Sequence, residues 1–285
     1  MSYSWTLNKE NPYFIGEIGI NHNGDMQLTK KLIDAVHACG WHCAKFQKRN
    51  PDVCVPEHQK NVSRDTPWGT MSYIDYKHKI EFQEEEYDYI DQYSKEKPID
   101  WTASVWDMDS LEFLKKYDVP FIKIPSAMIT DLELVAESAR SGVKVIMSTG
   151  MSTLEEVDKA VSTIMKNGKN PIIMHTNSSY PTPRGELNLN LIPFYKERYD
   201  CIIGYSGHEQ DLEPTVIAVA LGAKVIERHI TLSHKLWGTD QKSSLEVHAM
   251  SMLKKRCADI DLILGSSQKV VTESEVPVRK KLRKI

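Results

Sequence analysis

The sequence predicts a single-domain (β/α)8 barrel of the TIM type, an α/β fold. Short β-branched apolar runs alternate with helix-like runs along nearly all of the 285 residues. Such alternation is typical of a parallel sheet, and eight strand–helix units in roughly 250 residues fit a closed barrel. The alternative is an open, doubly wound sheet, but no Gly-x-Gly-x-x-Gly turn follows any of the expected strands.

The expected elements follow one another in a regular order. A capping side chain followed by acidic residues marks the start of two helices. The first set is Ser152 or Thr153 with Glu155 and Glu156, and the second is Asp109 or Ser110 with Glu112. Strands are expected at 13–20, 42–47, 100–106, 119–126, 143–150, 171–177, 201–207 and 224–231. The helices that follow them are expected at 26–40, 81–97, 109–117, 131–142, 152–168, 189–199, 211–222 and 243–265.

Two segments depart from this repeat. Residues 48–80 are long for a strand–helix connection, so they are either functional or locally folded. Residues 266–285 are polar and end in a basic cluster, and we expect them to be poorly ordered or to pack on a partner. We therefore expect the barrel at 1–265, and a tail at 266–285 that is too short to be a domain.

Composition and charge narrow the class of protein. The net charge of −3 favours neither nucleic acid nor a membrane surface as a partner, and we expect neither. No apolar run approaches the length of a membrane span. The N-terminus lacks the basic start and apolar stretch of a secretory signal. Five cysteines without a Cys-x-x-Cys motif exclude a disulfide scaffold and a thiolate zinc site. We expect a cytoplasmic protein with reduced, buried thiols.

Two histidines, His208 and His229, stand in similar settings 21 positions apart. Each follows or ends a buried strand, and the helix expected between them would bring the two strand ends together. Neutral imidazole is the commonest side-chain metal ligand, and two such groups with an open coordination sphere suit a catalytic divalent ion. The alternative is a pair of histidines that are hydrogen-bonded at strand ends.

Two lysines, Lys45 and Lys123, lie in otherwise apolar strands. A lysine that points inward needs an anionic partner or loses its proton. That partner is either a barrel carboxylate, such as Glu17 or Glu227, or a bound phosphate. A third reading is a Schiff-base lysine, but the histidine pair favours a metal-dependent route. Hydroxyl donors for a phosphate would come from Ser126, Ser148 and Ser206.

Other polar side chains fall near the carboxyl ends of the expected strands, where barrel enzymes have their active sites. Asn21 could contact a substrate or simply shape a turn, and Tyr180 could contact a substrate or brace a rigid proline turn. Further candidates at these ends are Gln47, Ser104 and Ser178, with Asp240 in the loop beyond the last strand.

Eight motifs follow one another along the chain in the order found in a known protein family. Their combination is far more specific than any one of them alone. They are GEIGINHNGD (16–25), AKFQK (44–48), KIPS (123–126), STGM (148–151), SSYPTP (178–183), GYSGHE (204–209), ERHIT (227–231) and WGTDQKSSLE (237–246). With these motifs the chain resembles the N-acylneuraminate (sialic acid) synthase family, which includes N-acylneuraminate-9-phosphate synthases.

The resemblance implies a transferase that condenses phosphoenolpyruvate with an aldose such as N-acetylmannosamine or its 6-phosphate. The products would be phosphate and a 3-deoxy-2-ulosonic acid. The cofactor would be Mn2+ or Mg2+, and the enzyme would be a homodimer. Two alternatives stay open. One is a related 3-deoxy-ulosonate-phosphate synthase with a different acceptor, and the other is a non-catalytic barrel that binds metabolites.

The resemblance also implies residue roles. His208 and His229 would bind the metal ion. Phosphoenolpyruvate would be bound by Lys45, Ser104, Lys123, Ser126, Ser148, Ser178 and Ser206. The catalytic groups would be Glu17, Lys45, Lys123, Glu227 and Asp240, and the sugar would contact Asn21, Gln47, Tyr180 and Asp240.

Two departures from the family pattern bear on the acceptor. Met128 stands where the family has a carboxylate that contacts the sugar, and a thioether accepts only weak hydrogen bonds. The family usually continues into an antifreeze-like domain, which we do not expect here. Three explanations stay open: another protein completes the site, the acceptor lacks the N-acyl group, or the chain is a truncated or minimal form. A phosphorylated acceptor would need extra cations, for which the candidates are Lys48, Arg64, Lys77, Arg184 and Lys242.

Overall fold

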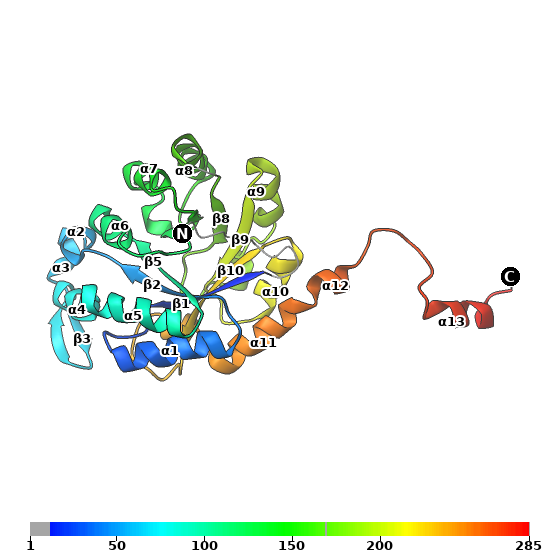
Figure 1. The fold of residues 1–285 in the computed structure, drawn as a ribbon, viewed down its shortest axis with the longest axis horizontal. Coiled ribbons are helices and arrows are strands. Elements are labelled where there is room, and N and C mark those ends of the chain that lie inside the picture. Colours follow the sequence, from blue (N-terminus) through cyan, green and yellow to red (C-terminus); the bar gives the residue numbers. More distant parts are fainter. Residues whose placement is uncertain (1–11, 169, 285) are drawn as a thin grey trace.

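The computed structural model describes residues 12–168 and 170–284, and its main feature is a closed parallel barrel (Figure 1). Strand β10 pairs with β1 in parallel, which closes the barrel, and the short strand β11 (Leu245–Glu246) pairs with the end of β10. The barrel strands are β1 (Tyr13–Gly19), β2 (Cys43–Lys48), β5 (Asp100–Val105), β6 (Ile122–Ile124), β7 (Val145–Ser148), β8 (Ile172–Thr176), β9 (Ile202–Gly207) and β10 (Val225–Thr231). The predicted (β/α)8 fold is confirmed.

A ring of helices covers the outside of the barrel (Figure 1). Their apolar faces pack with the outward side chains of the strands into one large core. The ring consists of α1 (Met26–Ala38), α5 (Glu84–Glu96), α6 (Met108–Leu114), α7 (Leu132–Arg140), α8 (Leu154–Asn167), α9 (Leu191–Tyr199), α10 (Glu213–Ala220) and α11 (Val247–Ala258). Each helix that the sequence predicts between or after the strands is present.

Element ends differ from the prediction where the local chemistry was misread. The strand expected at 119–126 is limited to Ile122–Ile124, because Pro125 has no N–H for the sheet and a 3-10 turn, η1 (Ser126–Met128), follows it. Helix α6 begins earlier than expected, because Asp107 and not Asp109 or Ser110 is its N-cap. Thr153 and Glu156 form the predicted capping box of α8.

The interior of the barrel changes from apolar to polar along the strands. A small cluster of fully buried apolar side chains forms the floor. Two positions further along a strand, the next inward side chain is ionic or hydroxyl-bearing, as the period of two requires. These pairs are Ile15 and Glu17, Cys43 and Lys45, Phe121 and Lys123, Ile146 and Ser148, and Val225 and Glu227. The charged layer therefore lies toward the carboxyl ends of the strands.

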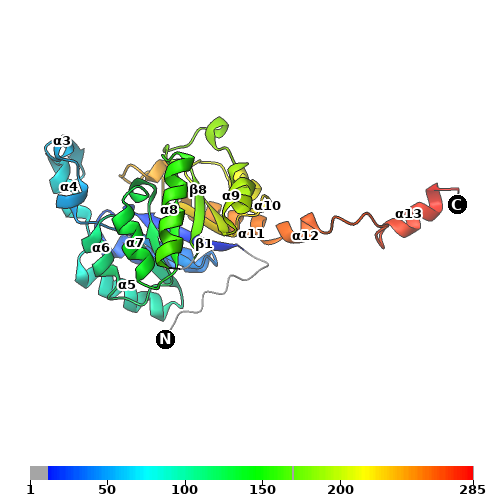
Figure 2. The ribbon, with the colours of Figure 1, turned by 90° about the horizontal axis from the view of Figure 1, so that it is seen from above.

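The long segment 48–80 is locally folded, one of the two forms that the sequence allowed. It contains the short helices α2 (Pro51–Cys54) and α3 (Glu57–Lys60), the antiparallel strands β3 (Ser63–Thr66) and β4 (Gly69–Ser72), and α4 (Tyr73–Ile80). Figure 2 shows α3 and α4 on one side of the barrel. The rings of Trp68 and Tyr76 lie 5.9 and 5.4 Å from that of Trp237, so this segment packs on the loop after β10.

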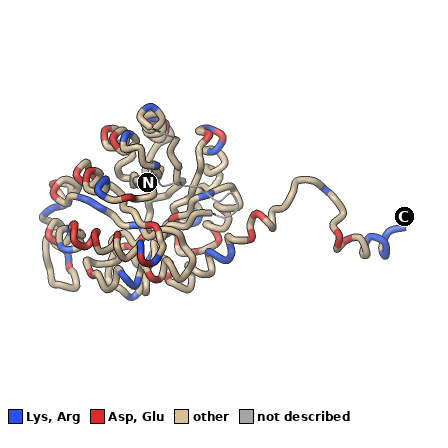
Figure 3. Tube along the Cα trace, in the orientation of Figure 1, with Lys and Arg blue, Asp and Glu red and all other residues tan. Residues whose placement is uncertain are grey.

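The C-terminal residues leave the barrel. After α12 (Ile260–Leu264) the chain extends away and ends in α13 (Glu275–Leu282) (Figures 1 and 2). The side chains from 265 to 284 are exposed, and basic residues gather at the end of this tail (Figure 3). Part of the tail is thus helical, whereas its packing on a partner stays a prediction.

Within the described residues, no helix combines the length and the apolar character that crossing a membrane requires. All five cysteines are free. Cys39, Cys43 and Cys257 are buried, but Cys54 and Cys201 are only partly so, which corrects the expectation that all five would be buried.

Candidate functional site

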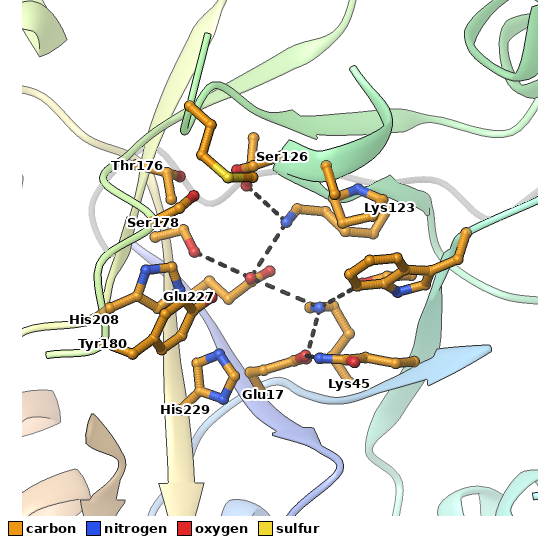
Figure 4. A pocket seen from close by; sticks show the side chains of 18 residues that line it. Glu17, Lys45, Lys123, Ser126, Thr176, Ser178, Tyr180, His208, Glu227 and His229 are labelled. Atoms are coloured by element: carbon orange, nitrogen blue, oxygen red, sulfur yellow. Dashed lines mark hydrogen bonds and ion pairs between the residues drawn. The ribbon is translucent and has the colours of Figure 1, made fainter. Parts of the chain in front are cut away.

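A cavity of about 190 Å3 opens at the carboxyl ends of the strands (Figure 4). Its walls contain all but two of the residues that the sequence predicts for the site. Those in the walls are Glu17, Lys45, Gln47, Ser104, Lys123, Ser126, Ser148, Ser178, Tyr180, Ser206, His208, Glu227 and His229. Asn21 and Asp240 are the two that lie outside it.

The pairing of the strands brings these residues together. Glu17 on β1 stands opposite Lys45 on β2 and opposite His229 on β10. In the same way Ser104 on β5 stands opposite Lys123 on β6, and Ser206 on β9 opposite Glu227 on β10. Residues far apart in the sequence therefore occupy one layer of the barrel.

The two lysines are tied to two carboxylates and two serines inside this layer. Lys45 Nζ lies 2.6 Å from Glu17 Oε2 and donates to Ser104 Oγ at 2.8 Å. Lys123 Nζ donates to Glu227 Oε1 at 3.2 Å, and Glu227 Oε1 is also 3.7 Å from Lys45 Nζ (Figure 4). Lys123 donates in addition to Ser148 Oγ at 2.8 Å, and Ser206 Oγ donates to Glu227 Oε1 at 3.1 Å.

These contacts shift the pKa values in different directions. Burial lowers the pKa of Lys45, but Glu17 and Glu227 outweigh it and leave the pKa above its ordinary value. For Lys123, burial is the larger effect and the pKa lies below its ordinary value, although Glu227 opposes the shift. Burial raises the pKa of Glu227, but Lys123 and Lys45 outweigh it and hold that pKa low. Lys123 is thus the lysine that loses its proton more readily.

Serine hydroxyls line another part of the cavity wall. Ser126 Oγ accepts a hydrogen bond from the N–H of Gly150 at 3.0 Å. A Cβ at Gly150 would overlap the hydroxyl of Ser178 and lie 2.8 Å from that of Ser126, so glycine is required there. With Ser148 these hydroxyls make a set of donors that suits a phosphate or a carboxylate.

The two histidines lie side by side, with ring centroids 5.3 Å apart. His208 Nδ1 lies 2.6 Å from the carbonyl oxygen of Asn177, and only a protonated Nδ1 can donate to it. Burial, with a smaller effect of His229, lowers the pKa of His208 to about 3, so the ring is neutral and Nε2 keeps its lone pair. The ring of Tyr180 lies 4.0 Å from that of His208 and covers it.

His229 also has a nitrogen that suits a metal ion. Its buried Nδ1 has no hydrogen-bond partner among the described residues and lies 3.8 Å from Asp240 Oδ2. Within residues 12–168 and 170–284, no group of three His, Cys, Asp or Glu side chains is arranged to hold a metal ion. A metal ion held by the two histidines would therefore need water or substrate as its remaining ligands.

Asp240 lines a second cavity, of about 890 Å3, which adjoins the first. Gln47, Trp106 and Tyr180 belong to the walls of both. Asn21 lies outside both walls, and its buried side-chain amide donates to Ile230 O at 2.9 Å and to Ser244 Oγ at 2.8 Å. In this structure Asn21 therefore ties the end of β10 to the loop that carries Asp240.

Some residues of the two walls were missed by the sequence reasoning. Trp106 and Thr176 line the first cavity, and Arg49 lines the second. Arg49 continues the alternation of Lys45 and Gln47 along β2, a signal that the sequence contains but that we did not use.

Comparison with known proteins gives the family of the chain. The model of the NeuB family matches residues 32–269. The chain belongs to the NeuB family. An N-acetylneuraminate-9-phosphate synthase of Drosophila melanogaster is 37% identical over 245 residues, which are 85% of this chain and 66% of that protein. The NeuB-family chain thus spans about two thirds of the length of this relative.

Two further relatives of this NeuB-family chain match over more of their length. An N,N'-diacetyllegionaminic acid synthase of Campylobacter jejuni is 32% identical, covering 92% of this chain and 80% of that protein. The crystal structure of an N-acetylneuraminic acid synthetase of Leptospira borgpetersenii, in complex with citrate, superposes with a TM-score of 0.85 at 30% identity. It covers 97% of this chain and 94% of that chain. The predicted family and enzyme class are confirmed.

Proposed function

We propose that this chain condenses phosphoenolpyruvate with an aldose, forming a 3-deoxy-2-ulosonate and releasing phosphate. The observation that carries the proposal is the convergence of Lys45 and Lys123 on one oxygen of Glu227, inside a layer of serine hydroxyls. The names of the relatives support it, since both the neuraminate and the legionaminic acid synthases make acids of this kind.

The layer suits the phosphate and carboxylate groups of phosphoenolpyruvate. Lys45 and Lys123 would donate to these groups in place of part of their present contacts with Glu17 and Glu227. Hydrogen bonds between ionised partners are among the strongest in proteins, so two buried lysines hold such an anion firmly. The remaining donors would be Ser104, Ser126, Ser148, Ser178 and Ser206.

The reaction then needs two bond-forming steps and one cleavage. C3 of phosphoenolpyruvate attacks the aldehyde carbon, and the aldehyde oxygen takes up a proton. Water adds at C2 and passes one proton to a carboxylate such as Glu17. The bond between C2 and the oxygen that bridges to phosphorus then breaks, C2 becomes the keto carbon, and the second proton of the water leaves with the phosphate. The lysines stabilise the charge on the departing phosphate, which is the role proposed for them in catalysis.

We also propose that His208 and His229 hold Mn2+ or Mg2+ through neutral imidazole nitrogens. When bound, such an ion supplies Lewis-acid polarisation of the acceptor aldehyde. Tyr180 packs against the ring of His208 at the mouth of this side of the site. Gln47, Tyr180 and Asp240 would orient the aldose, because they stand where the two cavities meet or in the wall beyond.

The first experiment measures phosphate release from phosphoenolpyruvate with Mn2+ and a panel of aldoses, and weighs the products by mass spectrometry. We expect release that requires both an aldose and the metal, with a product heavier by the pyruvyl unit. Lys123→Met should abolish it, whereas Lys166→Met, which removes an exposed lysine from α8, should not. Folded protein that binds no phosphoenolpyruvate and releases no phosphate would contradict the proposal.

A further inference from the structure

Two buried basic side chains face the second cavity without forming an ion pair with any described residue. Arg49 and Lys77 line its wall, and each side chain is 7% exposed. Neither forms an ion pair with any residue that the structure describes. Taking a charge out of water is costly unless an opposite charge compensates it, so this arrangement indicates a partner that comes from solution.

The surroundings of Arg49 show an unused donor. Its guanidinium lies 4.3 Å from the ring of Trp106 and donates one hydrogen bond to the side-chain oxygen of Gln47. Its Nε–H is buried and has no hydrogen-bond partner within the described ranges. A buried N–H without an acceptor is rare in folded proteins, and a ligand that supplies an oxygen would satisfy it.

Lys77 reaches the cavity from helix α4. Its Nζ lies 5.2 and 5.5 Å from the ring centroids of Tyr73 and Tyr76, which also hold the guanidinium of Arg64 at 4.9 and 5.4 Å. Burial, and next the positive charge of Arg49, lower the pKa of Lys77 to about 7. An anion placed between Arg49 and Lys77 would reverse this shift and restore the full charge.

The acidic residues of the same wall are engaged elsewhere. Asp107 accepts hydrogen bonds from the backbone N–H groups of Asn50 and Ser110, both at 2.7 Å. Asp109 accepts from the Asn50 side chain at 2.9 Å, and Asp131 caps helix α7. Asp240 lies 3.8 Å from His229 and raises the pKa of Lys77 through its charge, without forming an ion pair with it. Among the described residues, no carboxylate of this wall forms an ion pair with Arg49 or Lys77.

We propose that Arg49 and Lys77 form a subsite for an anionic group, a phosphate or a carboxylate, at the far end of the aldose acceptor. This inference rests on the proposed condensation, since it assigns the acceptor class of the same site. Arg49 offers a planar set of donors that matches either anion.

The position of the subsite fits an acceptor that spans both cavities. Lys45 and Gln47 lie two positions apart on β2, and Arg49 directly follows that strand and donates to the side-chain oxygen of Gln47. An aldehyde beside the lysines and an anion at Arg49 would thus lie at opposite ends of one sugar, with Gln47 between them. Met128 lines the same cavity, and a thioether there does not repel an anion as a carboxylate would.

The test compares three acceptors of one configuration: N-acetylmannosamine, its 6-phosphate, and N-acetylmannosaminuronic acid. The readout is kcat/KM for phosphoenolpyruvate consumption. We expect an anionic acceptor to exceed the neutral one by about tenfold or more, as for charged hydrogen bonds. In Arg49→Met and Lys77→Met, the ratio of kcat/KM for the anionic acceptor to kcat/KM for the neutral one should fall about tenfold, because KM for the anionic acceptor rises. Lys79→Met, on the same helix but exposed, should leave it unchanged. Which anion is preferred identifies the group.

Calorimetric binding of all three acceptors separates this inference from the proposed reaction. Loss of selective 6-phosphate or uronate binding in Arg49→Met, with partial retention in Arg49→Lys, supports the subsite even if no acceptor is turned over. Turnover of all three acceptors with a preference for neutral N-acetylmannosamine would overturn the subsite and leave the condensation standing. Equal loss of all three acceptors in both variants, at unchanged Tm, would also overturn it.

Discussion

Glu209 and Arg228 form an ion pair that is closed to solvent, with Arg228 Nη1 3.0 Å from Glu209 Oε1 and side-chain exposures of 0% and 1%. Each residue is the chain neighbour of one candidate metal ligand, Glu209 of His208 and Arg228 of His229. The guanidinium also donates to the backbone oxygen of Glu209 and to Thr215 Oγ1. The pair therefore links β10 to the turn after β9 and fixes the spacing of the two histidines.

Arg228→Met should lower the free energy of unfolding by about 3–5 kcal/mol, because it leaves the Glu209 carboxylate buried without its partner. Urea denaturation followed by circular dichroism measures this. The double variant Glu209→Gln with Arg228→Met should recover part of the loss, since it buries no charge. Arg256→Met breaks an exposed ion pair with Glu213 and should have little effect. Equal losses in Arg228→Met and Arg256→Met would contradict the role of the buried pair.

Binding of phosphoenolpyruvate should weaken as pH rises, and it should do so at a lower pH than the titration of an exposed lysine would cause. Burial places the pKa of Lys123 below its ordinary value, so this lysine loses its charge at a lower pH than an exposed lysine does. The protonated form binds the anion, and affinity is therefore lost as pH rises through that pKa. Lys123→Arg keeps its charge and should flatten the dependence. Calorimetric Kd values across neutral to alkaline pH test this, and the same slope in both proteins would contradict it.

The barrel could be predicted because its periodicity is local. The strand pattern was enough to offer Glu17 or Glu227 as the partner of the inward Lys45, since the carboxyl ends of all barrel strands meet at one face. The strand at 119–126 was predicted too long because the apolar pattern continues through Pro125, whose missing N–H ends the pairing. A hydrophobicity pattern does not reveal where strand pairing ends, whereas the missing backbone N–H of proline does.

The second cavity could not be predicted in the same way. Its cations come from different parts of the segment 48–80, which has no single period. The position of Lys77 depends on aromatic packing between Tyr76 and Trp237, residues that are far apart in the sequence. For Asn21 the sequence suggested a contact with the sugar because the residue belongs to a family motif. In the structure its side-chain amide donates to Ile230 O and Ser244 Oγ instead. The periodic pattern of the sequence thus predicts where the strands end, but it does not predict the path of a long, irregular connection.

Removing either candidate metal ligand should abolish turnover without unfolding the barrel. His208→Ala and His229→Ala each delete one of the two neutral imidazoles proposed to hold the ion. We expect Mn2+ binding, followed by electron paramagnetic resonance of the free ion, to be lost together with activity while Tm is nearly kept. His78→Ala removes a histidine on α4 that is largely exposed and should change neither property. Wild-type activity in His208→Ala, with metal strictly controlled, would remove the metal role.

Met128→Glu should shift acceptor preference toward neutral sugars. The new carboxylate would enter the cavity that Arg49 and Lys77 line, where it would pair with these cations and accept sugar hydroxyl bonds. We expect kcat/KM to rise for N-acetylmannosamine and to fall for its 6-phosphate, changing their ratio by about tenfold. Met128→Gln has nearly the same shape without the charge, so it separates electrostatics from steric fit. If both acceptors change in the same proportion in Met128→Glu, position 128 does not act on the charge of the acceptor.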